Sequence, residues 1–336
     1  MEETNETYNN KYASGRCRPV GSTSAKAAPF GNAYFFGDSL TDCCVTGRYT
    51  NGNTPNWADQ LPAQIGATYT ANTQTNLAIG GAQSGDDNAT LLLQSLYGAP
   101  TGLLAQVSRF GVQGVTVGPN DIAGIWIGVN DIWPSSYAAT DALSNGLAFN
   151  RPLGVQPDVS ALTSYFVGNI QSSIDQLKSN GFRNVVLVSP YDMGQSAIEP
   201  NAAAAALATQ YSNALVAAES QLYTPSVNTY FVNAESLLQQ AQANPGAYGF
   251  LHTTAADSCA VNNCTSQPLS VQNTYVFTDI IHFTSAFDQL IANDAAAVIN
   301  AGQTTPAPVP EPSTAALVFA VLLSLSVVRM ARKIEP

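Results

Sequence analysis

Between residues 33 and 301, short apolar runs alternate with longer segments whose apolar residues repeat at helical period. This alternation constrains the fold most, because a strand–helix–strand order favours a parallel sheet with helices packed on both faces. The sequence therefore predicts an α/β fold. The expected strands are Ala33–Phe36, a stretch leading to Asn76–Ile79, Ile122–Ile127, Val185–Ser189 and Thr229–Val232, and the expected helices are about Trp57–Ile65, Ser164–Asn180, Asn201–Gln221 and Ser285–Ala301.

The charge balance of the chain excludes one large class of function. Only 10% of the 336 residues are charged, and 12 Lys and Arg against 23 Asp and Glu give a net charge of −11. Binding to nucleic acids depends on clustered Lys and Arg that neutralise phosphates, so that function is excluded. Low charge with abundant Asn, Gln, Ser, Thr and Gly is typical of an exported protein.

The cysteines are not spaced like the ligands of a zinc site, because no C-x-x-C pair occurs and the chain has only two histidines. We therefore expect no structural metal. Cys259 and Cys264 flank a polar loop that a disulfide can close in an oxidising compartment, whereas the adjacent Cys43 and Cys44 are poorly placed for an ordinary bridge. Free or buried thiols remain the alternative for each pair. The fifth cysteine is Cys17.

The N-terminal part gives an indication against export. Residues 1–29 are polar and contain no apolar run that can form the core of a secretory signal. A misassigned start, a signal that lies upstream and another export route each account for this, and all three stay open.

The C-terminal part has the order of a membrane anchor. A Pro/Thr-rich linker over 303–312 leads to an uncharged segment over 313–328 and a basic tail over 329–336. Sixteen uncharged residues fall just below the roughly 17 to 25 that span a bilayer, so a buried core helix is the alternative. A core helix needs polar positions at helical spacing, and the centre of this segment offers only Ser324 and Ser326. We therefore expect a transmembrane helix with a cytoplasmic basic tail.

The same C-terminal segment resembles the PEP-CTERM sorting signal of Gram-negative bacteria. Val309–Thr314 carries the Pro-Glu-Pro sequence, and the apolar helix and the basic tail follow it in the expected order. The resemblance implies export to the cell envelope, at least transient anchoring in the membrane, and processing by an exosortase-type enzyme near the Pro-Glu-Pro.

A candidate nucleophile stands at the end of the first expected strand, in Gly37-Asp38-Ser39-Leu40. A serine that follows a strand and leads into a helix exposes its hydroxyl where backbone N–H groups can face a developing oxyanion. The elbow of the α/β-hydrolases needs Gly at position 41, where Thr41 stands, so this turn is of another kind. Taken alone the four residues are weak evidence, because a helix-capping Asp or Ser explains them equally well.

Three further segments place polar groups at strand ends or beside the last helix. Asn76–Ala82 ends in a glycine pair that can offer an unobstructed N–H, and Gly128–Asp131 brings an Asn amide to the end of an apolar strand. Asp279 precedes His282 at a spacing that lets the carboxylate reach the imidazole. Turns, a cap and a surface histidine explain each segment alone, but their coincidence in this order favours a single active site.

Together the four segments resemble the blocks of the SGNH (GDSL) hydrolase superfamily over about residues 30–302. Thr50–Ala58 and Asn244–Phe250 are similar to stretches of its bacterial phospholipase/lecithinase/hemolysin branch. The resemblance implies a three-layer α/β/α fold with a flavodoxin-like parallel sheet. It also implies a set of catalytic roles: Ser39 is the nucleophile, the oxyanion hole is formed by the N–H groups of Ser39 and Gly81 with the side chain of Asn130, and His282 is the general base oriented by Asp279.

Two departures from the branch affect the walls of this site. Cys43 and Cys44 stand where relatives usually continue with Thr-Gly-Asn, and Phe283 replaces a frequent Pro after the histidine. His252 is the only competing base in the chain.

The sequence thus predicts an exported serine esterase or lipase with a domain over 30–302, which needs neither cofactor nor metal. We expect a monomer that acts on a small-molecule, lipid or glycan ester. The alternative is a surface-displayed binding or matrix protein that keeps the fold with little turnover.

Overall fold

The computed structural model describes residues 30–89, 95–96, 100–138, 158–199 and 201–304. The polar extension, most of the linker, the expected transmembrane helix and the basic tail lie outside these residues. Within the described part of the chain, no helix has the length and apolar character that a membrane span requires.

Four parallel strands form one sheet, in the order in which they occur along the chain. They are β1 (Ala33–Gly37), β2 (Ile122–Trp126), β3 (Asn184–Val188) and β4 (Asn228–Val232). In the register of the sheet, Phe35 lies opposite Gly124 and Gly124 opposite Val186. Every residue of the first three strands is buried, as expected for a parallel sheet covered on both faces. The predicted α/β class is therefore confirmed.

The expected strand at Asn76–Ile79 is wrong. This segment runs beside β1, where Leu77 N donates to Phe35 O at 2.8 Å and Ile79 N donates to Gly37 O at 3.1 Å, but only an isolated bridge joins Asn76 to Phe35. The Asn76 side chain donates to Thr41 O at 2.8 Å and accepts from Ala78 N at 3.1 Å. These side-chain bonds offer the backbone of the segment alternatives to a regular ladder.

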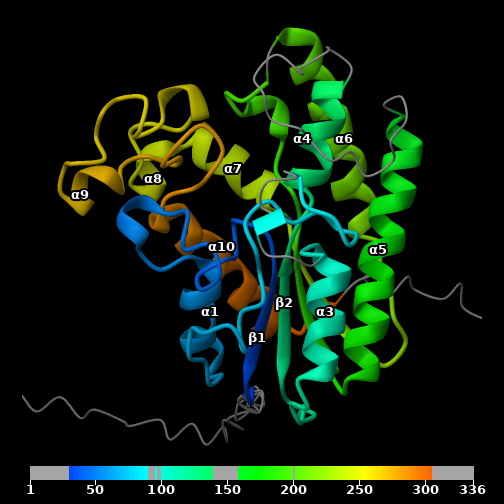
Figure 1. Ribbon diagram of the computed structural model, residues 1–336. Helices are drawn as coiled ribbons and strands as arrows, with labels where there is room; N and C mark the ends of the chain where they lie inside the picture. The colour runs from blue at the N-terminus through cyan, green and yellow to red at the C-terminus, as the bar shows by residue number, and fades with distance from the viewer. Residues whose placement is uncertain (1–29, 90–94, 97–99, 139–157, 200, 305–336) are drawn as a thin grey trace, which may run out of the picture.

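Helices cover the two faces of the sheet and form a three-layer molecule (Figure 1). Helices α1 and α10 pack together on one face, and α3, α5 and α6 lie on the other. Helix α1 matches its expected bounds, and α5, α6 and α10 match theirs within a few residues. The α-helices are α1 (Trp57–Ile65), α3 (Leu103–Val112), α4 (Val129–Ala138), α5 (Val159–Ser179), α6 (Ala202–Glu219), α7 (Ala234–Ala243), α8 (Pro245–Tyr248), α9 (Leu269–Gln272) and α10 (Ser285–Asn300).

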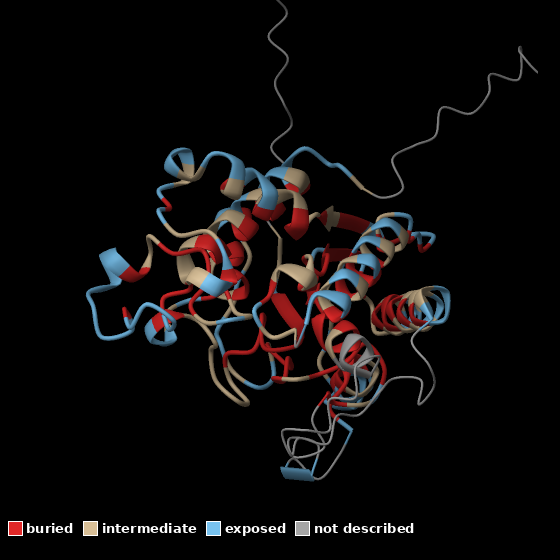
Figure 2. Cartoon of the chain, turned by 90° about the horizontal axis from the view of Figure 1, so that it is seen from above, coloured by how far each residue is buried: buried red, intermediate tan, exposed pale blue. Residues whose placement is uncertain are grey.

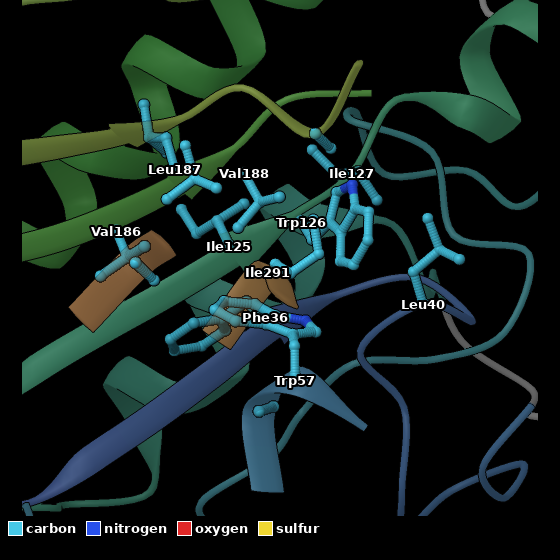
Figure 3. Close-up of a cluster of buried hydrophobic side chains, with 14 of the residues drawn as sticks. Phe36, Leu40, Trp57, Ile125, Trp126, Ile127, Val186, Leu187, Val188 and Ile291 are labelled. Carbon is cyan, nitrogen blue, oxygen red and sulfur yellow. The ribbon is translucent and has the colours of Figure 1, made fainter. Parts of the chain in front are cut away.

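Buried residues concentrate on the sheet and on the inner faces of the helices (Figure 2). At the carboxyl end of the sheet, the Trp57 ring packs edge-on against Phe35 at a centroid distance of 5.3 Å and against Trp126 at 6.1 Å. Leu40, the residue that follows Ser39, belongs to the same buried hydrophobic cluster as Phe36, Trp57 and Trp126, all of which are labelled in Figure 3. The core therefore reaches the turn that carries the candidate nucleophile.

The start of α1 is tied to the same turn. Asn56 caps the helix in a reciprocal capping box, in which its side chain accepts from Asp59 N at 3.2 Å and its own N–H donates to Asp59 Oδ2 at 3.1 Å. Nδ2 of Asn56 also donates to Thr41 O at 2.9 Å and to Asp42 O at 3.1 Å. One capping residue thus fixes both the helix and the loop after Ser39.

Candidate active site

Ser39 lies on a tight turn at the carboxyl end of β1. The strand ends at Gly37, whose φ of 142° belongs to the region that favours glycine, and a Cβ there would run into the carbonyl of Trp126. Thr41 N and Asp42 N then donate to Asp38 O at 3.0 and 2.9 Å. The chain makes this one turn after Ser39, and the next α-helix begins at Trp57, as expected from the sequence.

Gln106 of α3 holds the end of β1 from the side. Its Oε1 accepts from Gly37 N at 2.9 Å, and its Nε2 donates to Gly37 O at 2.8 Å. The side chain is fully buried, so both bonds are shielded from water. No short-range motif links Gln106 to the nucleophile turn, and the sequence did not reveal it.

The structure brings Ser39 beside His282, although 243 positions separate them in the sequence, and Asp279 lies three residues before the histidine. Nε2 of His282 lies 2.9 Å from Oγ of Ser39, and Nδ1 lies 2.8 Å from Oδ2 of Asp279. Because a carboxylate only accepts hydrogen bonds, Nδ1 is the donor, and Nε2 of the neutral ring is left to accept the serine proton. This is the arrangement of a nucleophile, a base and an orienting carboxylate.

The local backbone before α10 orients Asp279. Its Oδ1 accepts from Ile281 N at 2.9 Å and from His282 N at 2.7 Å. Burial works against ionisation of this carboxyl, but its hydrogen bonds with His282 and the charge interaction between the two outweigh burial and lower the pKa of Asp279. The group is therefore a carboxylate at neutral pH, as an orienting acceptor must be.

Two aromatic residues fix the imidazole in place. Tyr49 stacks on the His282 ring at a centroid distance of 4.6 Å. Phe283, which replaces the frequent Pro, is buried and stacks on Trp126 at 5.9 Å and on Phe287 at 4.4 Å. The loop of the histidine is thus anchored to the core by an aromatic side chain.

Three hydrogen-bond donors at this edge of the sheet have no partner among the described residues. Nδ2 of Asn130 is buried, lies at the start of α4, and makes no hydrogen bond of normal geometry. The backbone N–H groups of Ser39 and Gly81 likewise donate to no other described residue. Because β1, β2 and the segment beside β1 are neighbours, the three donors belong to segments at the same edge of the sheet.

Two buried carboxyl groups stand beside these donors. Burial raises the pKa of Asp38 to about 8, and the N–H of Leu40 and the Asn130 amide offset this only in part. Burial also raises the pKa of Asp131 to about 7, against hydrogen bonds from Ser84. Asp38 is therefore mostly protonated at neutral pH, so that a full negative charge does not oppose a developing oxyanion.

His252 is not joined to Ser39. Its Nδ1 lies 2.8 Å from Oδ2 of Asp257, and its ring stacks on Tyr275 at 3.9 Å. This second His–Asp pair belongs to the lobe that contains α8 and α9, on the upper left of Figure 1.

The four cysteines of the described region form two disulfides. Cys259 is bonded to Cys264, and both are buried. Cys43 is bonded to Cys44, which differs from the expectation that adjacent residues are poorly placed for a bridge. The chain bends sharply here, because Oδ1 of Asp42 accepts from Cys44 N at 2.9 Å and from Val45 N at 3.0 Å.

Comparison with known proteins identifies a family that matches most of the described domain. Residues 35–256 match the GDSL-like lipase/acylhydrolase family, a range that contains Ser39, Gly81 and Asn130 but ends before Asp279 and His282. A solved structure, described as a member of the lipolytic protein G-D-S-L family from Veillonella parvula DSM 2008, is similar to this chain at 14% identity, with a TM-score of 0.41 and coverage of 80% of this chain and 97% of that chain. No curated protein matches.

Proposed function

The chain belongs to the GDSL-like lipase/acylhydrolase family, and from that premise we propose that it is a serine hydrolase that cleaves carboxylic esters. The observation that carries the proposal is the continuous contact from Asp279 through His282 to Ser39, at 2.8 and 2.9 Å. Three N–H donors without partners among the described residues lie at the same edge of the sheet. A nucleophile, a base and an oxyanion site are the parts that acyl transfer requires.

In the first half of the reaction, Oγ of Ser39 attacks the carbonyl carbon while its proton passes to Nε2 of His282. The carbonyl oxygen becomes an oxyanion, which the N–H groups of Ser39 and Gly81 and the Asn130 amide stabilise. The bond to the leaving oxygen then breaks, His282 returns the proton to it, and the alcohol departs. The acyl group remains on Ser39.

In the second half, a water molecule attacks the acyl-enzyme and gives a proton to His282. The bond between the acyl carbon and Oγ of Ser39 breaks, the proton returns to Oγ, and the carboxylic acid leaves. Asp279 stays ionised throughout and stabilises the imidazolium that forms in each half.

The test is hydrolysis of p-nitrophenyl acetate by the purified protein, with labelling by a fluorophosphonate probe mapped by mass spectrometry. We expect turnover and a single label on Ser39. A folded protein with no turnover and no label at Ser39 would contradict the proposal and favour a binding or matrix protein. Parallel assays on longer acyl esters, phospholipids and acetylated sugars then define the substrate.

We further propose that the protein is exported and anchored in the envelope of a Gram-negative bacterium through residues 313–328, and that an exosortase-type enzyme processes it near the Pro-Glu-Pro over 310–312. Two disulfides support the export proposal, because such bonds persist in oxidising compartments. Deletion of residues 306–336 should release active protein from the membrane fraction. Unchanged membrane retention after the deletion would contradict the anchor.

A further inference from the structure

Asp42 is a buried carboxylate that the proposed mechanism does not use. It lies three residues after Ser39, and its own N–H donates to Asp38 O at 2.9 Å. Oδ2 accepts from Thr46 N and from Gly80 N, each at 3.0 Å, and also from the Thr46 hydroxyl. One side chain therefore joins the nucleophile turn to the glycine pair, although 38 residues separate Asp42 from Gly80.

Asn88 holds the opposite side of the same glycine. Its Nδ2 donates to Gly80 O at 2.9 Å, and its backbone neighbour Ala89 donates to Gly81 O at 2.7 Å. The Asn88 side chain is fully buried. Gly81 has a φ of 79°, and a Cβ there would run into Asn88, so the glycine pair and the amide fit closely.

The two contacts determine where the N–H of Gly81 points. In a trans peptide the C=O of one residue and the N–H of the next point in opposite directions. Since Asn88 binds Gly80 O, the Gly81 N–H on the same peptide plane is directed away from Asn88. Asp42 fixes the other side of Gly80 and keeps that plane at a set position relative to Ser39.

We infer that Asp42 and Asn88 are positioning residues for the oxyanion site, which they hold by clamping Gly80 from both sides. The inference rests on the proposed function, since it concerns the donor that stabilises the transition state of that reaction. The clamp changes the rate of acyl transfer without contacting the substrate.

Two isosteric substitutions test the clamp, each aimed at one of its two hydrogen bonds. Asp42→Asn can replace the acceptor for Gly80 N with a donor, and Asn88→Asp replaces the donor for Gly80 O with an acceptor. The matched control is Asp121→Asn, because Asp121 is a buried carboxylate that accepts backbone N–H groups from Asn32 at 2.7 Å and Gly118 at 2.9 Å, at the amino end of β2.

The readouts are kcat and KM for p-nitrophenyl acetate and the Ki of a trifluoromethyl ketone, whose adduct with Ser39 carries an oxyanion. Each clamp variant should lower kcat by about 10-fold to 100-fold, because small misplacement of reacting groups costs factors of this size. KM should change little, while Ki should rise by a factor similar to the fall in kcat. Asp121→Asn should keep wild-type values of all three.

Wild-type kcat and Ki in both clamp variants would overturn the inference, and so would an equal fall in Asp121→Asn. Failure of the proposed function is distinct, because then the wild type neither turns over nor is labelled. If Asp42→Asn or Asn88→Asp does not fold, Thr46→Val replaces it, since Thr46 Oγ1 lies 3.2 Å from Gly80 N. Thr46→Ser should restore the kcat that Thr46→Val loses, and equal kcat in the two would also overturn the inference.

Discussion

Two His–Asp pairs lie within about thirty residues of each other, and their local geometry is nearly the same. In each pair Nδ1 of the histidine lies 2.8 Å from Oδ2 of the aspartate, in His282–Asp279 and in His252–Asp257. Each imidazole also stacks on a tyrosine. A paired and oriented imidazole is therefore not sufficient to mark a catalytic base.

The surroundings of the two pairs differ. His282 lies at the carboxyl edge of the sheet, and Oγ of Ser39 faces its Nε2. His252 is instead joined through its backbone to Val276, whose N–H donates to His252 O at 2.8 Å. Asn262 binds Asp257 at 2.7 Å and links this pair to the cysteine loop. Of the two histidines, only His282 is placed next to a serine hydroxyl at the edge of the sheet, which is the position that the proposed base requires.

The largest effect should come from removing the serine that distinguishes the first pair. Ser39→Ala should reduce ester hydrolysis to the uncatalysed background and abolish fluorophosphonate labelling, since Oγ of Ser39 is the hydroxyl that lies 2.9 Å from Nε2 of His282. The matched control is Ser258→Ala, because Ser258 is buried directly after Asp257 of the second pair. Equal loss of activity in the two variants would break the distinction between the pairs.

The second-largest effect on activity should come from removing one of the proposed oxyanion donors, which lie near the His282–Asp279 pair. Asn130→Ala should lower kcat by about 10²–10³, the usual result of losing one oxyanion donor. Because the buried Asn130 amide makes no hydrogen bond of normal geometry with the described residues, the substitution should leave the fold unchanged, which circular dichroism checks. A kcat within a factor of two of wild type would remove Asn130 from the oxyanion site.

A smaller effect should appear in the pH dependence of stability. The pKa of Asp38 is raised by burial to about 8 in the folded protein, against about 3.9 when unfolded. Between these values only the unfolded state ionises, so this group lowers the free energy of unfolding as the pH rises from about 4 to about 8. Asp38→Asn should therefore gain stability relative to wild type over that range, measured by urea unfolding.

Asp257 of the second pair provides the control with the opposite sign. Its hydrogen bond with His252 lowers the pKa of Asp257 in the folded protein. The ionised group therefore adds to the free energy of unfolding above its unfolded pKa, and this contribution is lost as the pH falls through the folded pKa. Asp257→Asn should thus lose a little stability near neutral pH, and little only, because the group is exposed. A pH dependence for Asp38→Asn that runs in the same direction as that of Asp257→Asn would contradict the assignment.

The smallest expected effect is confined to the lobe of the second pair. Replacing Cys259 and Cys264 by Ser should lower the free energy of unfolding by about 2 kcal/mol, the contribution of a disulfide that closes so short a loop. Activity of the folded variant should stay at the wild-type level. A large loss of kcat would show that this lobe positions the first pair.

The sequence predicted the parts of the molecule that depend on local pattern. Four buried apolar runs appear as strands within a residue or two of the expected bounds, since burial on both faces leaves a continuous apolar signal. Asn76–Ile79 carries a similar signal but is joined to β1 by one isolated bridge, and its Asn76 side chain bonds Thr41 O, 35 positions away. Periodicity does not reveal such tertiary contacts.

The residues of the candidate site also fall into two groups, those that the sequence predicted and those that it did not. Ser39, Gly81, Asn130, Asp279 and His282 could be proposed because each stands in a short motif that follows an expected strand or precedes the last helix. Tyr49, Gln106 and Asp42 could not, since their partners are distant in sequence. Asn88 could not either, because no local pattern marks its bond to Gly80, eight residues away. Residues that position a site are therefore harder to predict than residues that react in it.

The most direct test of the central claim compares the two histidines in the full-length protein. The measurement is kcat/KM for p-nitrophenyl acetate in His282→Ala and His252→Ala, with folding checked by circular dichroism. We predict that His282→Ala falls nearly to background, because an unassisted serine hydroxyl is a poor nucleophile near neutral pH, while folded His252→Ala keeps wild-type activity. Full activity in His282→Ala together with none in His252→Ala would contradict the account.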